Sequence, residues 1–201
     1  MLKRVVLSFF IIFITASSVF AGPFGLEMGM SLEYITKACN GTRPERLEND
    51  DRYLISPTKS HPDFEHYLVW VDETKGLYRV RAISTEVITS KYGTELKSFF
   101  HDMTERLSKA YGKPEIYDKI NEDVLSVFKT EDQWMWTLHE GSRVLAAVWN
   151  KDSRRTTMPD KLSYVDLYAD TPKYSYTKGY LVLEYEFENY DEVKNSQDDV
   201  F

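Results

Sequence analysis

An amphipathic pattern between residues 94 and 111 constrains the fold of this chain more than any other feature. Apolar side chains recur there at helical spacing: Leu96, Phe99, Phe100, Met103, Leu107, Ala110 and Tyr111. Gly112 and Pro114 follow directly, as is typical where a helix ends. The pattern predicts a long helix with one face in the core. Periodicity alone accounts for the aromatic and methionine stripe, so it indicates core rather than a cofactor site.

A shorter helix is predicted at Ser31 to Cys39, with Ser31 as N-cap and Asn40-Gly41 as the stop. Leu32, Ile35 and Cys39 share one face of it. Cys39 is the single cysteine of the chain, so no internal disulfide can form. The spacing favours a buried structural thiol over a reactive one, because free cysteine is among the most buried residue types.

The other segments are typical of strands. We expect strands at 53–55, 67–71 and 77–84 before the long helix, and at 124–128, 133–138, 143–149, 162–169 and 181–187 after it. The segments 133–138 and 143–149 are predicted to form a hairpin.

Two of these strands predict which side chains share a face. In 77–84, Tyr78, Val80 and Ala82 should lie opposite Arg79 and Arg81. In the last strand, Leu181, Leu183, Tyr185 and Phe187 should face the core, with Val182, Glu184 and Glu186 facing out.

These elements predict an α+β fold in which two helices pack on antiparallel sheet. We expect a single domain over 22–190, followed by an acidic tail at 191–201 that forms a short helix or a frayed end, with Val200 and Phe201 docked. The halves 31–88 and 94–187 both run from a helix into strands, and tryptophans occur on the predicted strands of each. A tandem repeat of an α-β-β-β unit is therefore a hypothesis.

The N-terminus predicts export. Lys3 and Arg4 precede an apolar run, and Val19 and Ala21 form a small-residue cleavage site, so residues 1–21 resemble a cleavable signal peptide. An uncleaved anchor is the alternative. No later segment is apolar over the ~20 residues that a spanning helix needs. We expect a periplasmic or secreted protein without a membrane span, and the lack of disulfides favours a bacterial periplasm.

The charge of the chain bears on its partners. Residues 22–201 keep 23 of the 25 Lys and Arg and all 32 Asp and Glu, a net charge of −9. An acidic surface repels nucleic acid and anionic membranes, which argues against both as partners. It fits a solubilised exported protein or one that meets a basic partner.

A search of the sequence for catalytic and metal-binding motifs gives little information on function. His61, Asp63, Glu65 and His66 form the densest group of metal-ligand types, but they do not share one face in a strand or a helix, so a polar loop is favoured. The sequence contains no nucleophile elbow, P-loop, dinucleotide fingerprint, zinc-protease motif or Cys-x-x-Cys. We predict no cofactor, no metal and no identifiable catalytic residue. A carboxylate pair of the glycosidase type stays open.

Two loops carry the candidate binding residues. Tyr174, Tyr176 and Tyr180 lie in a predicted loop before the last strand, and exposed tyrosines are favoured at protein interfaces. The alternative is that they fold back on the sheet with only their hydroxyls in water. Arg154 and Arg155 mark a second exposed loop, for which a solvated surface is the alternative.

The segment from Phe24 to Glu33, Phe-Gly-Leu-Glu-Met-Gly-Met-Ser-Leu-Glu, resembles the opening of many small bacterial envelope proteins. In these a Gly-Met-Ser step precedes the first helix. The chain is similar in this respect to the BamE-like and beta-lactamase-inhibitor-like group, which is built from helix-plus-sheet units that are sometimes doubled. The resemblance implies a binding or assembly role at the envelope rather than an enzyme.

Three functions follow as hypotheses. The first is a non-enzymatic periplasmic binding or inhibitor protein that holds a protein partner on a sheet face or on the two loops. The second is a hydrolase of an envelope polymer that uses a carboxylate pair. The third is a structural envelope protein whose C-terminal tail docks on its own sheet.

Overall fold

The computed structural model describes residues 22–47, 51–159 and 161–198. Nine strands of these residues form one antiparallel sheet in the order β1-β2-β3-β4-β9-β8-β7-β6, with β5 paired to the start of β9. The predicted signal peptide and the residues Val200 and Phe201 lie outside the described residues.

The bounds of the elements are as follows. The strands are β1 (Glu45–Arg46), β2 (Arg52–Ile55), β3 (Phe64–Asp72), β4 (Gly76–Ser84), β5 (Val87–Ile88), β6 (Glu115–Ile120), β7 (Arg143–Asn150), β8 (Leu162–Asp170) and β9 (Lys178–Phe187). The helices are α1 (Leu32–Ala38), α2 (Thr94–Tyr111), α3 (Trp134–His139) and α4 (Tyr190–Asp198), with 3₁₀ turns at Pro23–Gly25, Ser126–Phe128 and Glu131–Gln133.

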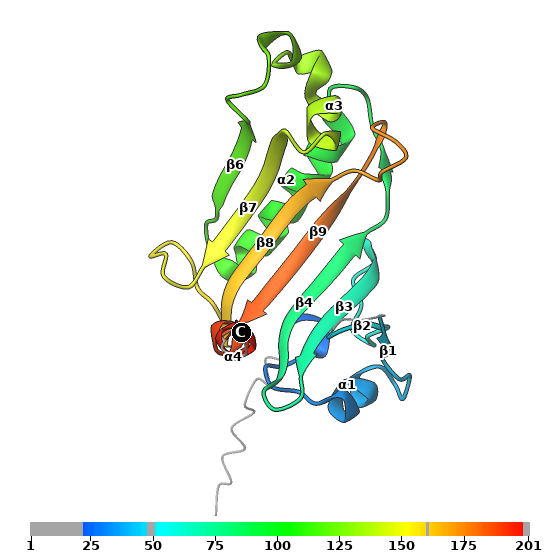
Figure 1. Ribbon diagram of the computed structural model, residues 1–201, viewed down its shortest axis with the longest axis vertical. Coiled ribbons are helices and arrows are strands. Elements are labelled where there is room, and N and C mark those ends of the chain that lie inside the picture. The colour runs from blue at the N-terminus through cyan, green and yellow to red at the C-terminus, as the bar shows by residue number, and fades with distance from the viewer. Residues whose placement is uncertain (1–21, 48–50, 160, 199–201) are drawn as a thin grey trace, which may run out of the picture.

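The long helix α2 lies behind the sheet in Figure 1 and crosses β7, β8 and β9. Its side chains Leu96, Phe100 and Met103 are at most 3% exposed. They share one core with inward side chains of β3, β4, β7, β8 and β9 and with residues of α1 and α3. The chain is 27% helical and 36% strand, so the predicted α+β class is confirmed.

The two halves of the chain meet at the centre of the sheet. The strands β1 to β4 form one antiparallel meander after α1, and β6 to β9 form a second after α2. The last strand of each meander pairs with the last strand of the other, β4 with β9. A helix followed by a meander thus occurs twice, although the second half also contains α3.

Two predicted strands are wrong. Residues 124–128 form a turn and a 3₁₀ segment, and the segment expected at 133–138 is the helix α3. The buried residues of α3, Trp134, Met135 and Leu138, fit helical spacing, and a short apolar run does not distinguish helix from buried strand. No hairpin forms there: β7 pairs antiparallel with β6, a mostly exposed edge strand whose sequence lacks the apolar alternation of the others.

The predicted face of Tyr78 is also wrong. A register shift at Trp70/Val71 turns Tyr78 to the side opposite Val80 and Ala82. There it packs with Trp70 and with Val193 of α4, outside the main core. The remaining alternation holds, because Val80 and Ala82 are fully buried in the main core.

The segment Leu26 to Met30 is held against the start of β4. The Gly29 N–H donates to the Leu77 carbonyl at 2.8 Å, and the Leu77 N–H donates to the Met30 carbonyl at 2.9 Å. A Cβ on Gly76 would lie 2.2 Å from the Gly29 carbonyl oxygen, and Gly76 has a φ of +70°. Glycine is therefore required at 76 by both the close approach and the left-handed backbone.

Two further predictions, the burial of Cys39 and a helix in the acidic tail, are confirmed. Cys39 is 2% exposed, and burial raises the pKa of its thiol, so it is a buried cysteine. The acidic tail begins as the helix α4, whose Val193 is fully buried against Trp70 and Tyr78. Within the described residues, no helix combines the length and the apolar character that crossing a membrane requires.

Candidate functional site

The two faces of the sheet differ in the helices that cover them. The face behind β7 to β9 is occupied by α2. Among the described residues, the only helix on the face toward the viewer in Figure 1 is α4, at its lower end. We call the outward side chains of β4 and β6 to β9 the open face. They include Arg79, Arg81, Glu115, Tyr117, Lys119, Val148, Asn150, Tyr164, Asp166, Tyr168, Asp170, Tyr180, Val182, Glu184 and Glu186.

The strand register arranges the open face in rows across the sheet. One row runs Arg81, Glu184, Asp166, Val148 and Glu115, each opposite the next on the neighbouring strand. Residues opposite each other across antiparallel strands lie within side-chain contact. The row therefore puts two carboxylates, Glu184 and Asp166, side by side near the middle of the sheet.

A second row runs from Arg79 through Glu186 and Tyr164 to Asn150. It lies next to the first, so the carboxylate of Glu186 is diagonal to Asp166. Like charges so placed destabilise one another unless cations or protons compensate them.

Glu184 is compensated by two arginines. Its residue is 6% exposed, and the guanidinium groups of Arg79 and Arg81 both donate hydrogen bonds to its carboxylate. The same guanidinium groups stack on the ring of Trp70, with carbon-to-centroid distances of 4.8 and 5.3 Å. Arg79 and Arg81 thus already have a carboxylate and an aromatic partner.

Asp166 is not compensated in this way. Its Oδ1 atom is buried and has no hydrogen-bond partner among the described residues. Burial, and then the charges of Glu184 and Glu186, raise the pKa of Asp166 to about 6. The pKa of Glu186 is also raised, mainly by burial, although Arg79 Nε lies 3.8 Å from its Oε1. An acceptor atom is therefore held in the sheet face with nothing donating to it.

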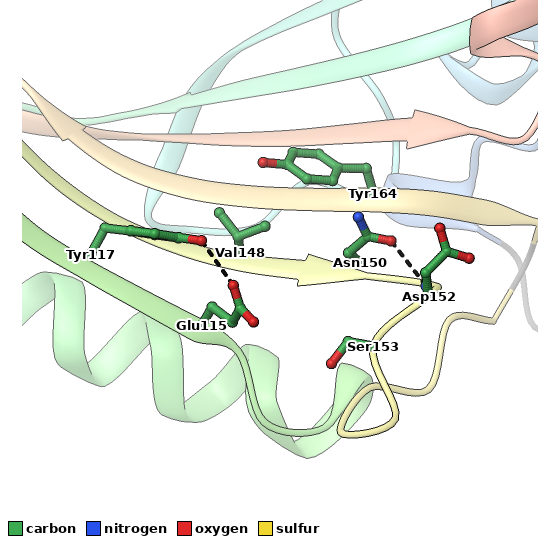
Figure 2. Close-up of a pocket in the computed structure, with 7 residues that line it drawn as sticks. All are labelled: Glu115, Tyr117, Val148, Asn150, Asp152, Ser153 and Tyr164. Carbon is green, nitrogen blue, oxygen red and sulfur yellow. Dashed lines mark hydrogen bonds between the residues drawn. The ribbon is translucent and has the colours of Figure 1, made fainter.

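A hollow of about 480 Å³ opens on the same face, over β6, β7 and β8. Figure 2 shows Tyr117 projecting from β6 and Tyr164 from β8, with Val148 of β7 between them. The other lining residues are Glu115, Asn150, Asp152 and Ser153. The volume lies within the range of pockets that bind small groups.

The hydrogen bonds of the hollow fix its polar groups. The Tyr117 hydroxyl donates to Glu115 Oε2 at 2.8 Å, and the Asp152 N–H donates to Asn150 Oδ1 at 2.9 Å, both drawn in Figure 2. Burial and the charges of Asp166 and Glu186 raise the pKa of Tyr164 to about 12. The hollow thus combines two neutral phenol rings with carboxylates and no basic lining residue.

Of the candidate residues from the sequence, Tyr180 belongs to the open face and the others lie in loops. Tyr174 and Tyr176 are 72% and 50% exposed in the loop between β8 and β9. The Tyr174 hydroxyl donates to the carboxylate of Glu86. Tyr180 is not in that loop but in β9, where its hydroxyl donates to Asp170 Oδ2 at 3.2 Å.

Arg154 and Arg155 are exposed in the loop between β7 and β8. That loop lies at the opposite end of β8 from the tyrosine loop (Figure 1). The structure therefore does not bring the two predicted groups into one site. The loop with the arginines follows Asp152 and Ser153 and so borders the hollow.

The histidine cluster is a loop only in part. His61 and Asp63 lie in the loop before β3, as expected, whereas Glu65 and His66 lie in β3 itself. The Asp63 N–H donates to His61 Nδ1 at 3.2 Å, and Arg106 Nη1 pairs with the Asp63 carboxylate at 3.0 Å. His66 pairs instead with Glu65, at 3.5 Å. In the described residues, no three His, Cys, Asp or Glu side chains converge as a metal site would require.

Sequence reasoning missed Tyr117, Tyr164 and Asp166. A signal was present in β8, where Tyr164, Asp166 and Tyr168 alternate with Val165 and Leu167. That pattern indicates an outward face made of aromatic and acidic side chains. Tyr117 gave no signal, because its strand was not predicted.

Comparison with known proteins finds no matching family model, no curated protein and no solved structure with significant similarity to this chain. Its function therefore has to be argued from the geometry of the open face.

Proposed function

We propose that this chain is an exported, non-enzymatic binding or inhibitor protein that holds a protein partner on its open face. The observation that carries the proposal is Asp166, whose buried Oδ1 has no donor among the described residues. A buried acceptor without a donor costs about 1–3 kcal/mol. A partner that covers the open face and donates to this oxygen would recover that free energy.

The composition of the open face supports the same function. Tyrosine, tryptophan and arginine are the residues most enriched in the energetically dominant parts of protein interfaces. Tyr164 and Tyr168 lie on β8, Arg79 and Arg81 lie on β4 across β9, and the ring of Trp70 packs against the two guanidinium groups. This surface is rigid, because it consists of strands rather than loops, which lowers the entropic cost of binding.

Location at the bacterial envelope is part of the proposal. It is supported by the signal-peptide pattern of residues 1–21 and by the resemblance of residues 24–33 to small envelope proteins. The net charge of −9 over residues 22–201 favours a partner with a basic surface.

Affinity capture with two double variants tests the proposal. Tyr164→Ala with Tyr168→Ala alters the open face, and Tyr34→Ala with Tyr92→Ala removes two tyrosines that are 59% and 45% exposed elsewhere. The wild-type chain and the Tyr34/Tyr92 variant should retain the same crosslinked partner from envelope extract, and the Tyr164/Tyr168 variant should lose it. Equal capture by both variants contradicts the proposal.

A hydrolase of an envelope polymer is the second candidate. One observation favours it: the pKa of Asp166, about 6, suits a general acid near neutral pH, and carboxylates lie near it. The test is release of dye from labelled cell-wall polymer by the purified chain and by Asp166→Asn. Release that depends on Asp166 would establish the hydrolase, and its absence would leave the binding function.

A further inference from the structure

Building on the proposed binding function, we propose that the hollow between Tyr117 and Tyr164 receives a lysine or arginine side chain of the protein partner. Four features of the hollow support this: its aromatic walls, its carboxylates, its apolar floor and the state of the basic side chains around it.

The walls are two tyrosine rings. Tyr117 and Tyr164 come from β6 and β8, the strands on either side of β7, and both line the same hollow (Figure 2). A ring face attracts an ammonium or guanidinium group through its quadrupole. The chain already shows this attraction, because Lys119 Nζ lies 5.2 Å from the centroid of Tyr117.

The rim is acidic. Glu115 and Asp152 are exposed lining residues. Tyr117 donates to one Glu115 oxygen, and no basic side chain in the described residues forms a salt bridge with either carboxylate. Asp166 and Glu186 stand next to the hollow, opposite Val148 and Tyr164 on the neighbouring strands. The potential in the hollow is therefore negative, and it selects a cation.

The floor suits a side chain rather than a bare ion. Val148 lies between the two rings, so an entering side chain has apolar surface for its stem while its charged head reaches a rim carboxylate (Figure 2). Lysine and arginine have that form, with an apolar stem and a charged head. A partner anchored here would have its neighbouring residues over Asp166, where a donor is missing.

The basic residues near the hollow do not line it. Lys119 lies against the ring of Tyr117 but is not one of the lining residues. Arg79 and Arg81 are engaged by Glu184. Lys151 lies 4.0 Å from Glu188, and Arg154 and Arg155 follow in the loop without lining the hollow. A cation from outside the chain can therefore reach the acidic and aromatic lining of the hollow.

Titration with short peptides tests the inference. The probes are a capped peptide of alternating arginine and serine and the same peptide with glutamine in place of arginine, each added to the isotope-labelled chain purified from the exporting cell. We expect the arginine peptide to shift the amide resonances of Glu115, Tyr117 and Val148, and the glutamine peptide to leave them in place.

A matched pair of charge variants makes the result specific. Glu115→Gln with Asp152→Asn removes two exposed carboxylates from the rim, and Asp102→Asn with Glu105→Gln removes two exposed carboxylates from α2. We expect the rim variant to bind the arginine peptide at least about tenfold more weakly than wild type, and the α2 variant to bind within about twofold. Melting temperatures near wild type would show that both variants fold.

Two results would overturn the inference: no shift at the hollow with the arginine peptide, or equal weakening by both charge variants. Either leaves the proposed function standing if the partner is still captured through Tyr164 and Tyr168. Conversely, if the partner is not captured but the arginine peptide still binds, the proposed partner binding is refuted and the cation site in the hollow is supported. The two failures are therefore distinguishable.

Discussion

The covered and open faces of the sheet are built from the same strands, but their buried side chains are stabilised by different interactions. On β9, Leu181 and Leu183 point to α2 and are buried by apolar packing. On the other side of the same strand, Glu184 is just as buried and depends on Arg79 and Arg81. Burial on the covered face thus makes a core, whereas on the open face it holds charges in fixed positions. Fixed charges are what a recognition surface needs.

The largest expected effect is on the covered face. Phe100→Ala empties a site that is fully buried beneath the sheet. The free energy of unfolding should fall by about 3–5 kcal/mol, measured by chemical denaturation. Tyr168→Ala, on the half-buried side of β8, should cost clearly less. Equal losses would contradict the distinction between a packed face and a recognition face.

The next effect is on the arginine cluster. Glu184→Ala leaves two partly buried guanidinium groups without their carboxylate, and removing one member of a buried ion pair costs about 3 kcal/mol. Glu186→Ala is the control, because Glu186 lies 3.8 Å from one arginine and is more exposed. A loss for Glu186→Ala as large as that for Glu184→Ala would show that the pairing is not specific.

The helix α4 provides a third comparison, since it covers Trp70 and Tyr78 on the same side of the sheet as the open face. Val193→Ala removes two methyl groups from a fully buried position and should lower the free energy of unfolding by about 1.5–2 kcal/mol. Thermal melting measures the change. An unchanged melting temperature would mean that α4 does not dock on Trp70 and Tyr78 in solution.

The smallest expected effect is the pH response of Asp166. Its pKa in the folded chain, about 6, exceeds the ordinary value of 3.8, so the folded state binds the proton more tightly. The stabilisation is therefore full below pH 3.8 and is lost as the pH rises to 6. Relative to wild type, Asp166→Asn should gain about 1–2 kcal/mol of stability between acidic and neutral pH, allowing for solvent screening.

The control for this prediction is Asp102→Asn, which removes the same charge from an exposed position on α2. Denaturation curves at several pH values compare both variants with wild type. A pH trend shared by the two variants would come from net charge alone, and it would remove the evidence that Asp166 is strained in the open face.

The covered face could be predicted from the sequence, and most of the open face could not. The helix at 94–111 has the predicted bounds, because helical spacing puts its apolar residues on one side, where Leu96, Phe100 and Met103 are buried. The inward residues of β9 were predicted for the same reason. Such periodicity identifies the buried side of an element. It does not indicate which contacts the polar side makes.

The open face depends on strand order, which local pattern does not specify. The pairing of β4 with β9 brings Arg79 and Arg81 to Glu184, more than 100 positions along the chain. The edge strand β6 places Tyr117 in the hollow, yet its sequence is too polar to have been predicted as a strand. Tyr174 and Tyr176 stood out in the sequence because several tyrosines lie close together there. Such a cluster carries no information on where the side chains lie in the fold.

The central claim, that the open face holds a protein partner, is tested most directly by crosslinking in the exporting cell. A photoreactive phenylalanine analogue is placed at Tyr164 in one chain and, as control, at the exposed Tyr34 of α1 in another. We predict one discrete crosslinked adduct from position 164 and none of that size from position 34. No adduct from 164, or the same adduct from both positions, would contradict the claim.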